Sequence, residues 1–422
     1  MEPSVHQFVK KTIREHEEWR GRCWNLIASE NITSPAVAAL LVNDLSHRYG
    51  DYEGIDLNSR KYRGNRFIVQ LEKKCHGLGR ELFGAEHIDL RPLSGHIAGV
   101  APLFTFCKPG DTVLELSQEC GGHRLGGKLV NCPLVPIRTQ PLPFDADQFN
   151  IDVRQTLRLV ESEKPRFIIL GSSTFLFPHP VADLRHGIDT LGVGTLLQYD
   201  ASHVLGLIAG KRFQKPLAEG ADLITSSTHK TLGGPQGGLV LTNSGAIAEA
   251  VGKALQPGLL SNHHLHRLPA LCQTFQEWLE KDGTDADRIV AASQALAAAL
   301  ERLGISVVAS HLGYTASHTI LVQTKQLGSA KDLALALEDA DILAGACRLP
   351  GQWGPEGLRL GTQEVVRRGM RTEDMEEVAS VIAALLKREL DPQSARKRVN
   401  ALARKVAKRA DSNSVRGSVS HD

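Results

Sequence analysis

Between residues 111 and 243 the chain alternates short apolar runs with helix-like segments, and this alternation constrains the fold more than any other feature. The apolar runs are DTVLEL (111–116), RFIILGSS (166–173), TLLQYD (195–200), GLIAG (206–210), ADLITSS (221–227) and GGLVLTN (237–243). Their apolar residues are continuous rather than alternating, which is typical of strands covered on both faces. Strands separated by helices predict an α/β fold with a mainly parallel sheet between helical layers.

Other segments flank this alternating region. The first 20 residues predict an exposed helix, residues 33–46 a second helix in which Pro35 suits the first turn, and residues 67–85 a third that ends at a glycine. After residue 275 the alanine-rich stretch 288–303 predicts a helix, 305–310 and 318–324 predict strands, and 331–342 predicts a helix. These later segments predict a small α+β domain.

The length of 422 residues exceeds that of one ordinary domain. We expect an N-terminal arm over residues 1–45, a large domain over 46–275, a small C-terminal domain over 276–410 and a disordered tail over 411–422. The basic run that begins the C-terminal tail is interpreted as a solvated helix face.

Composition excludes several classes of function. The formal net charge is +2, so no strong overall field favours nucleic acid or a membrane surface as a partner. The sequence shows neither a signal peptide nor an apolar run of membrane-spanning length. The seven cysteines include no CxxC pair, which disfavours zinc and favours reduced thiols in a cytoplasmic protein.

Polar residues that carry chemistry follow three of the predicted strands. Ser172 and Ser173 follow the first, Asp200 and His203 the second, and the run from Ser226 to Lys230 the third. A fourth segment, Ser94-Gly95-His96, precedes an apolar helical run, where backbone N–H groups and a hydroxyl can bind an anion. An anion site, a carboxylate and an amine together suggest pyridoxal 5′-phosphate, because its phosphate, ring nitrogen and aldehyde need these three groups.

Taken singly, each of these residues also has an ordinary structural interpretation. Lys230 alone is typical of a solvated loop lysine, Asp200 of a turn aspartate and His203 of a loop histidine. Their joint occurrence at successive strand ends favours the cofactor site.

Eight blocks of sequence carry a resemblance to a known family. They are ASEN, LSGH, GGHRLGG, FLFPHPV, DASHVLGLIAG, STHKTLGGPQGG, SNHHLH and GLRLGT, in this order. The chain resembles serine hydroxymethyltransferase, closest to the archaeal-type branch, from residue 25 to residue 370. The resemblance implies the fold type I of pyridoxal-phosphate enzymes, with a mainly parallel seven-stranded sheet in the large domain and a small C-terminal α+β domain.

The resemblance also implies roles for individual residues. Lys230 corresponds to the Schiff-base lysine, Asp200 to the partner of the ring nitrogen, and His123 to the residue stacked on the ring. The remaining implied cofactor contacts are Ser94, Gly95, His96, Ser173, His203 and His229. Arg359 corresponds to the clamp for the substrate carboxylate, and its planar fork suits that task. Tyr49 and Tyr62 correspond to an aromatic loop that the family shares across a dimer interface.

This aromatic loop departs from the family pattern by about three extra residues between Tyr49 and Tyr62. The family glutamate that handles protons therefore corresponds to Glu53 or to Asp51. We prefer Glu53, because Gly54 follows it as the pattern requires. Gly233 also stands where many relatives have arginine.

The resemblance implies a transferase that interconverts a β-hydroxy-α-amino acid and glycine, with serine, glycine and a tetrahydrofolate-type one-carbon carrier as substrates. The alternative is a folate-independent threonine aldolase or transaldolase that passes the glycyl unit to another aldehyde. Either enzyme is expected to be a homodimer or larger oligomer with a shared active site. We expect no metal, since the adjacent His263 and His264 point in different directions.

Overall fold

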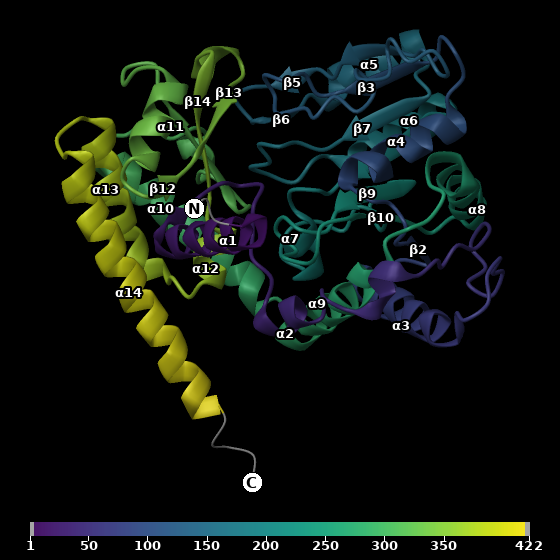
Figure 1. Ribbon diagram of the computed structural model, residues 1–422. Helices are drawn as coiled ribbons and strands as arrows, with labels where there is room; N and C mark the ends of the chain where they lie inside the picture. Colours follow the sequence, from purple (N-terminus) through teal and green to yellow (C-terminus); the bar gives the residue numbers. More distant parts are fainter. Residues whose placement is uncertain (1–3, 418–422) are drawn as a thin grey trace. The chain divides into compact units, whose positions relative to one another are not determined.

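The computed structural model describes residues 4–417 and divides them into two compact units (Figure 1). The first unit comprises the chain up to Ala28, residues 288–347 and the chain from Trp353 onward. The second comprises Ser29–Asp287 and Arg348–Gln352. The disordered tail expected over 411–422 falls partly within the last helix, and residues 418–422 lie outside the described residues.

A seven-stranded sheet forms the centre of the second unit. Its strands, from one edge to the other, are β2 (His87–Asp89), β10 (Gly238–Thr242), β9 (Leu223–Ser227), β8 (Leu196–Asp200), β7 (Phe167–Leu170), β3 (Thr112–Glu115) and β4 (Arg138–Pro141). The five strands from β9 to β4 are parallel, and β10 runs antiparallel to both of its neighbours. The predicted α/β fold with a mainly parallel sheet is confirmed.

Helices cover both faces of this sheet (Figure 1). They are α3 (Arg66–Phe83), α4 (Gly95–Phe106), α5 (Val153–Glu163), α6 (Val181–Leu191), α7 (Leu205–Ala209), α8 (Gly245–Lys253) and α9 (Leu268–Lys281). Helix α4 packs on β9 and β10, and its buried side chains share a core with residues of the central strands such as Phe167 and Leu223. A small hairpin, β5 (Phe144–Asp145) and β6 (Asn150–Ile151), lies outside the main sheet.

Three sequence-based expectations are wrong in detail. The run GLIAG belongs to helix α7 rather than to a strand, because a short apolar run does not distinguish a buried strand from a buried helix. The helix expected over 33–46 is only α2 (Pro35–Ala39), and the Asn43 side chain donates to the Leu40 carbonyl at 2.8 Å just beyond it. In the stretch 305–310 only an isolated bridge from Val307 to Val322 forms.

The first unit combines small sheets with longer helices. Its strands are β1 (Trp24–Asn25), β11 (Thr319–Gln323), β12 (Ile342–Leu343), β13 (Gly345–Arg348) and β14 (Glu356–Gly361), of which β11, β14 and β13 form one sheet. Its helices are α1 (Val5–Arg22), α11 (Ala330–Glu338), α12 (Gln363–Arg367), α13 (Met375–Leu386) and α14 (Pro392–Gly417), and α10 (Thr284–Arg302) enters it from the second unit.

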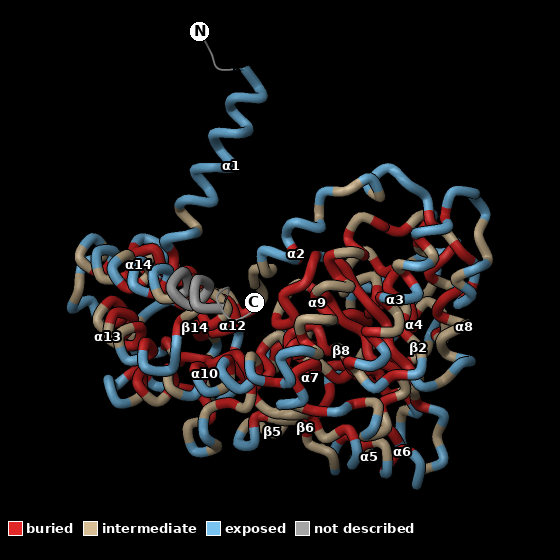
Figure 2. The backbone as a smooth tube through the Cα atoms, turned by 90° about the horizontal axis from the view of Figure 1, so that it is seen from below, coloured by how far each residue is buried: buried red, intermediate tan, exposed pale blue. Residues whose placement is uncertain are grey.

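Helix α1 confirms the expected exposed N-terminal helix. None of its residues is buried, and Figure 2 shows it in the colour of exposed residues along most of its length. Among residues 4–417, no helix has both the length and the apolar character needed to cross a membrane.

Candidate active site

The carboxyl ends of the parallel strands β7, β8 and β9 form the floor of the candidate site. Strands β8 and β9 pair so that Asp200 lies opposite Thr225, and the Ala201 N–H donates to the Thr225 carbonyl at 2.9 Å. Gly171, which follows β7, has a φ of 147°, and a Cβ there would lie 2.7 Å from the Asp200 Cβ. Glycine therefore permits the close approach of the β7 and β8 ends.

Asp200 is half-buried and held in place by the turn that follows β8. Its Oδ1 accepts a hydrogen bond from the Ser202 N–H at 2.9 Å. Burial lowers the pKa of three groups around it, and the negative charge of Asp200 opposes that effect in each case. These groups are His96, His123 and Lys128. The carboxylate therefore lies within electrostatic range of two imidazoles and an ammonium.

Lys230 follows β9 in a tight turn. Its carbonyl accepts hydrogen bonds from the Asn31 side chain and from the Gly233 N–H, both at 2.9 Å. Gly233 has a φ of 66°, a left-handed conformation that favours glycine over residues with a side chain. The turn thus fixes the backbone of a half-buried lysine at the strand end.

The amino end of α4 packs against the end of β9. Ser94 caps this helix, and its Oγ accepts from the Ile97 N–H at 3.2 Å. A Cβ at Gly95 would lie 2.8 Å from the Ser227 N, so only glycine fits without displacing the backbone. The first turn of a helix leaves N–H groups without intrahelical acceptors, which suits a phosphate.

Three histidines lie around Asp200 and Lys230. The rings of His96 and His123 meet edge to face, with centroids 5.8 Å apart and planes at 86°. Burial lowers the pKa of His229, and the positive charge of Lys230 lowers it further. The Nδ1 atoms of His96 and His229 are buried and have no hydrogen-bond partner among the described residues.

These observations fit pyridoxal phosphate. The cluster combines an amine, a carboxylate, a glycine that admits close contact at a helix start, and two buried imidazole nitrogens that lack partners. Buried polar atoms are nearly always hydrogen-bonded, so unpartnered nitrogens at one place indicate a polar group that binds there. Lys230, Asp200 and the first turn of α4 are the residues that would hold the cofactor's aldehyde carbon, ring nitrogen and phosphate.

Two further predicted cofactor contacts lie next to the strand ends. The Ser173 N–H and Oγ–H both donate to the Gly121 carbonyl, at 2.7 and 2.9 Å. This serine therefore stabilises the loop that contains His123. His203 is 8% exposed in the turn after Asp200. Their contact with the cofactor stays a prediction.

The aromatic loop lines a separate cavity of about 440 Å³ in the second unit. Tyr49 and Tyr62 meet there edge to face at 5.4 Å and are 55% and 44% exposed. Asp51 and Glu53 both line the cavity. The Asp51 Oδ1 is buried without a hydrogen-bond partner, whereas Glu53 is exposed. Gln256, which is 6% exposed, also lines the cavity, and its Oε1 lacks a partner.

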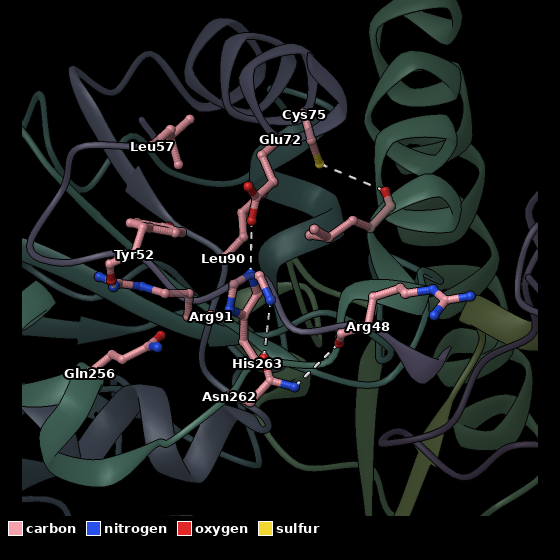
Figure 3. Close-up of polar contacts among 12 residues, drawn as sticks. Arg48, Tyr52, Leu57, Glu72, Cys75, Leu90, Arg91, Gln256, Asn262 and His263 are labelled. Atoms are coloured by element: carbon pink, nitrogen blue, oxygen red, sulfur yellow. Dashed lines mark hydrogen bonds and ion pairs between the residues drawn. The ribbon is translucent and has the colours of Figure 1, made fainter. Parts of the chain in front are cut away.

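A buried network of charged and aromatic side chains holds this loop against the rest of the second unit (Figure 3). Glu72 forms an ion pair with Arg60 and shares a hydrogen bond of 2.8 Å with His263 Nε2. The Tyr52 ring lies beside two guanidinium groups, with the carbons of Arg60 and Arg91 4.7 and 4.3 Å from its centroid. Residues of the loop itself, Tyr52 and Arg60, therefore supply part of its anchorage.

His263 consequently has a structural partner in Glu72. Among the described residues, no group of three or more histidine, cysteine, aspartate or glutamate side chains is arranged to hold a metal ion.

Arg359 lies on β14 of the first unit, opposite Leu321 of β11. Burial lowers the pKa of its guanidinium, and Cys347 opposes that effect. Its role toward the substrate carboxylate stays a prediction.

Sequence reasoning missed Glu115 and Lys128. Glu115 ends β3, and its carboxylate accepts from the N–H groups of Gly126 and Gly127 at 3.0 and 2.7 Å. Lys128 Nζ is 3.0 Å from His123 Nε2. The sequence did contain a signal for both, because a charged residue stands on each side of the glycine-rich block GGHRLGG. Glu115 lies before the block at the end of a predicted strand, and Lys128 follows it, five residues after His123.

Comparisons with known proteins agree with this geometry. The family model described as serine hydroxymethyltransferase matches residues 3–382. The serine hydroxymethyltransferase of Methanopyrus kandleri is 42% identical over 408 residues, which cover 95% of this chain and 93% of that protein. That of Korarchaeum cryptofilum is 41% identical, covering 91% and 92%. The solved structure of L-threonine transaldolase from Pseudomonas fluorescens, in its internal aldimine state, superposes with a TM-score of 0.90 at 28% identity, covering 95% of this chain and 92% of that chain.

Proposed function

Because the chain belongs to the serine hydroxymethyltransferase family, we propose that this pyridoxal-phosphate-dependent enzyme interconverts serine and glycine with a folate-type one-carbon carrier. The observation that carries the proposal is the meeting of Lys230, Asp200 and the imidazole cluster at the ends of β7, β8 and β9. The bound cofactor supplies an aldehyde that captures an amino group and a ring that accepts the electron pair of a broken bond.

The chain's own residues bind and orient the reacting groups. Lys230 supplies the amine that the substrate amino group replaces, and Asp200 holds a proton at the ring nitrogen. Arg359 holds the substrate carboxylate through two parallel hydrogen bonds, which orients the bond to be cleaved. His123 lies against the cofactor ring, and Ser94 and the first turn of α4 hold the phosphate.

Proton transfer at the substrate β-hydroxyl is assigned to the aromatic loop. Asp51 and Glu53 are the two available carboxylates, and a general acid or base of this kind contributes roughly 10²–10⁴-fold to the rate. The buried, unpartnered Oδ1 of Asp51 supports Asp51, and the following Gly54 supports Glu53. Tyr62 and Tyr49 complete this part of the site from the second subunit of a homodimer.

The second candidate function is folate-independent cleavage of threonine and transfer of the glycyl unit to another aldehyde. The structural similarity to L-threonine transaldolase supports it, and it needs the same cofactor site. The seven free cysteines support a reducing, cytoplasmic location for either enzyme.

The first test is cofactor attachment. Purified protein incubated with pyridoxal phosphate is expected to develop a visible absorbance band that Lys230→Ala abolishes. Lys215→Ala, which changes an exposed lysine of the same unit, is expected to keep the band. Absence of the band from the unaltered protein contradicts both candidate functions.

A further inference from the structure

Lys128 contacts the His123 ring from within the same loop. Its Nζ lies 3.0 Å from His123 Nε2. An ammonium group has three N–H donors and no acceptor, so Lys128 donates and the imidazole nitrogen accepts. An imidazole that accepts at Nε2 is neutral and carries its proton on Nδ1.

The backbone around Lys128 is anchored in the core. Leu125 and Leu129 are 1% and 8% exposed and belong to the buried cluster beneath α4. A Cβ at Gly99 of α4 would lie 2.6 Å from the Leu125 Cδ1, so the loop packs directly on this helix. The Lys128 side chain therefore starts from a fixed position.

Glu115 provides a second anchor and a counter-charge. Its carboxylate, 5% exposed as a residue, accepts from the Gly126 and Gly127 N–H groups. The negative charges of Glu115 and Asp200 raise the pKa of Lys128 against the larger effect of partial burial, which lowers it. Both charges favour the ammonium form, which is the form that donates to His123.

The cationic groups around His123 act on its pKa in the same direction as Lys128, and the Asp200 carboxylate acts against them. Surrounding protein atoms lower the pKa of the imidazole, Asp200 opposes this, and Lys128, Lys230 and His96 lower it further. A protonated ring would add a positive charge next to the Lys128 ammonium group. It would also lose the acceptor atom that Lys128 uses.

We propose that Lys128 is a positioning residue for His123: it donates to Nε2, fixes the proton on Nδ1 and keeps the ring neutral. The consequence for catalysis rests on the proposed function, because a neutral His123 lies against the cofactor ring without repelling the protonated ring nitrogen beside Asp200. The tautomer itself depends only on the Lys128–His123 contact. Both side chains are exposed, although neighbouring protein atoms partly desolvate them, so we expect a pKa effect of about one unit or less.

The direct test is the nitrogen NMR spectrum of histidine-labelled protein loaded with pyridoxal phosphate, with His123 assigned through His123→Asn. In the unaltered protein His123 is expected to show a non-protonated Nε2. In Lys128→Met this preference is expected to disappear, and the titration midpoint is expected to rise by up to about one pH unit. Lys128→Arg, which retains a cationic donor, is expected to restore both. Lys108→Met, at an exposed lysine outside the site, is expected to change neither.

An unchanged His123 tautomer and midpoint in Lys128→Met overturn the proposal. The activity of the protein and its dependence on pH are measured as well, so that failure of the positioning role can be distinguished from failure of the proposed function. If the NMR changes occur but the protein transfers no hydroxymethyl group, the positioning role stands and the proposed function fails. If activity is present and its acidic limb lies at the same pH in Lys128→Met, the catalytic consequence is contradicted.

Discussion

Asp51 and Glu53 are two residues apart but have different surroundings. The Asp51 Oδ1 is enclosed by protein and lacks a hydrogen-bond partner, whereas Glu53 is exposed. A carboxylate oxygen with no protein donor can exchange a proton with a substrate hydroxyl that comes within hydrogen-bond distance, because no donor has to be displaced first.

We therefore expect Asp51→Asn to lower kcat for serine cleavage by roughly 10²-fold or more, with a much smaller change in KM. Glu53→Gln is the matched control, since it removes the neighbouring carboxylate and keeps the length of the side chain. A large loss in Glu53→Gln with little effect of Asp51→Asn would instead assign the proton transfer to Glu53. The measurement is steady-state kinetics of both variants at several pH values.

The packing of α4 on the sheet sets the position of the proposed phosphate site. Gly95 places the first turn of this helix directly against the end of β9, where a Cβ would lie 2.8 Å from the Ser227 N and 2.9 Å from the Ser227 Cβ. Because Ser227 belongs to a buried strand, it cannot move aside easily. The position of the helix start, and so of its N–H groups, depends on this glycine.

Gly95→Ala is expected to destabilise the protein by about 1–3 kcal/mol and to weaken pyridoxal phosphate binding. Gly77→Ala in α3 is the matched control: no atom lies within 4 Å of the place its added methyl group would take, so the free energy of unfolding should rise by about 0.5–1 kcal/mol. Chemical denaturation and cofactor titration measure both effects. Unchanged cofactor affinity in Gly95→Ala would show that the start of α4 does not hold the phosphate.

Element by element, sequence reasoning succeeded where local signals were strong. Continuous apolar runs predicted β3, β7, β8, β9 and β10, and the glycine after α3 predicted its end, where Gly84 has a φ of 62°. The prediction failed for α7, because a run of five residues is too short for the spacing of its apolar side chains to distinguish a helix from a strand. Its helical form depends on tertiary packing. Lys128 and Glu115 were missed for a related reason: their partners lie in a loop whose path depends on the packing of Leu125 against Gly99 of α4.

The whole molecule is expected to form a complete active site only as a dimer or larger oligomer. Tyr49 and Tyr62 are 55% and 44% exposed in the single chain although they line a cavity with Asp51. If a second subunit receives this loop, each active site combines Lys230 from one chain with Tyr62 from the other.

This arrangement predicts complementation between two inactive variants. Lys230→Ala and Tyr62→Phe are each expected to be inactive or nearly so, and a co-refolded equal mixture is expected to regain roughly a quarter of the normal activity, because half of the dimers then contain one intact site of two. Activity of the mixture that equals the average of the two variants would contradict a shared site. Sedimentation analysis of the mixture provides the control for dimer formation.

The product formed from serine tests the proposed function most directly. Purified protein loaded with pyridoxal phosphate is incubated with isotopically labelled serine, with and without tetrahydrofolate, and glycine is measured, with threonine as the parallel substrate. We expect rapid glycine formation from serine that depends on the carrier and is lost in Lys230→Ala. Faster, carrier-independent release of glycine and acetaldehyde from threonine, with little reaction of serine, would contradict it.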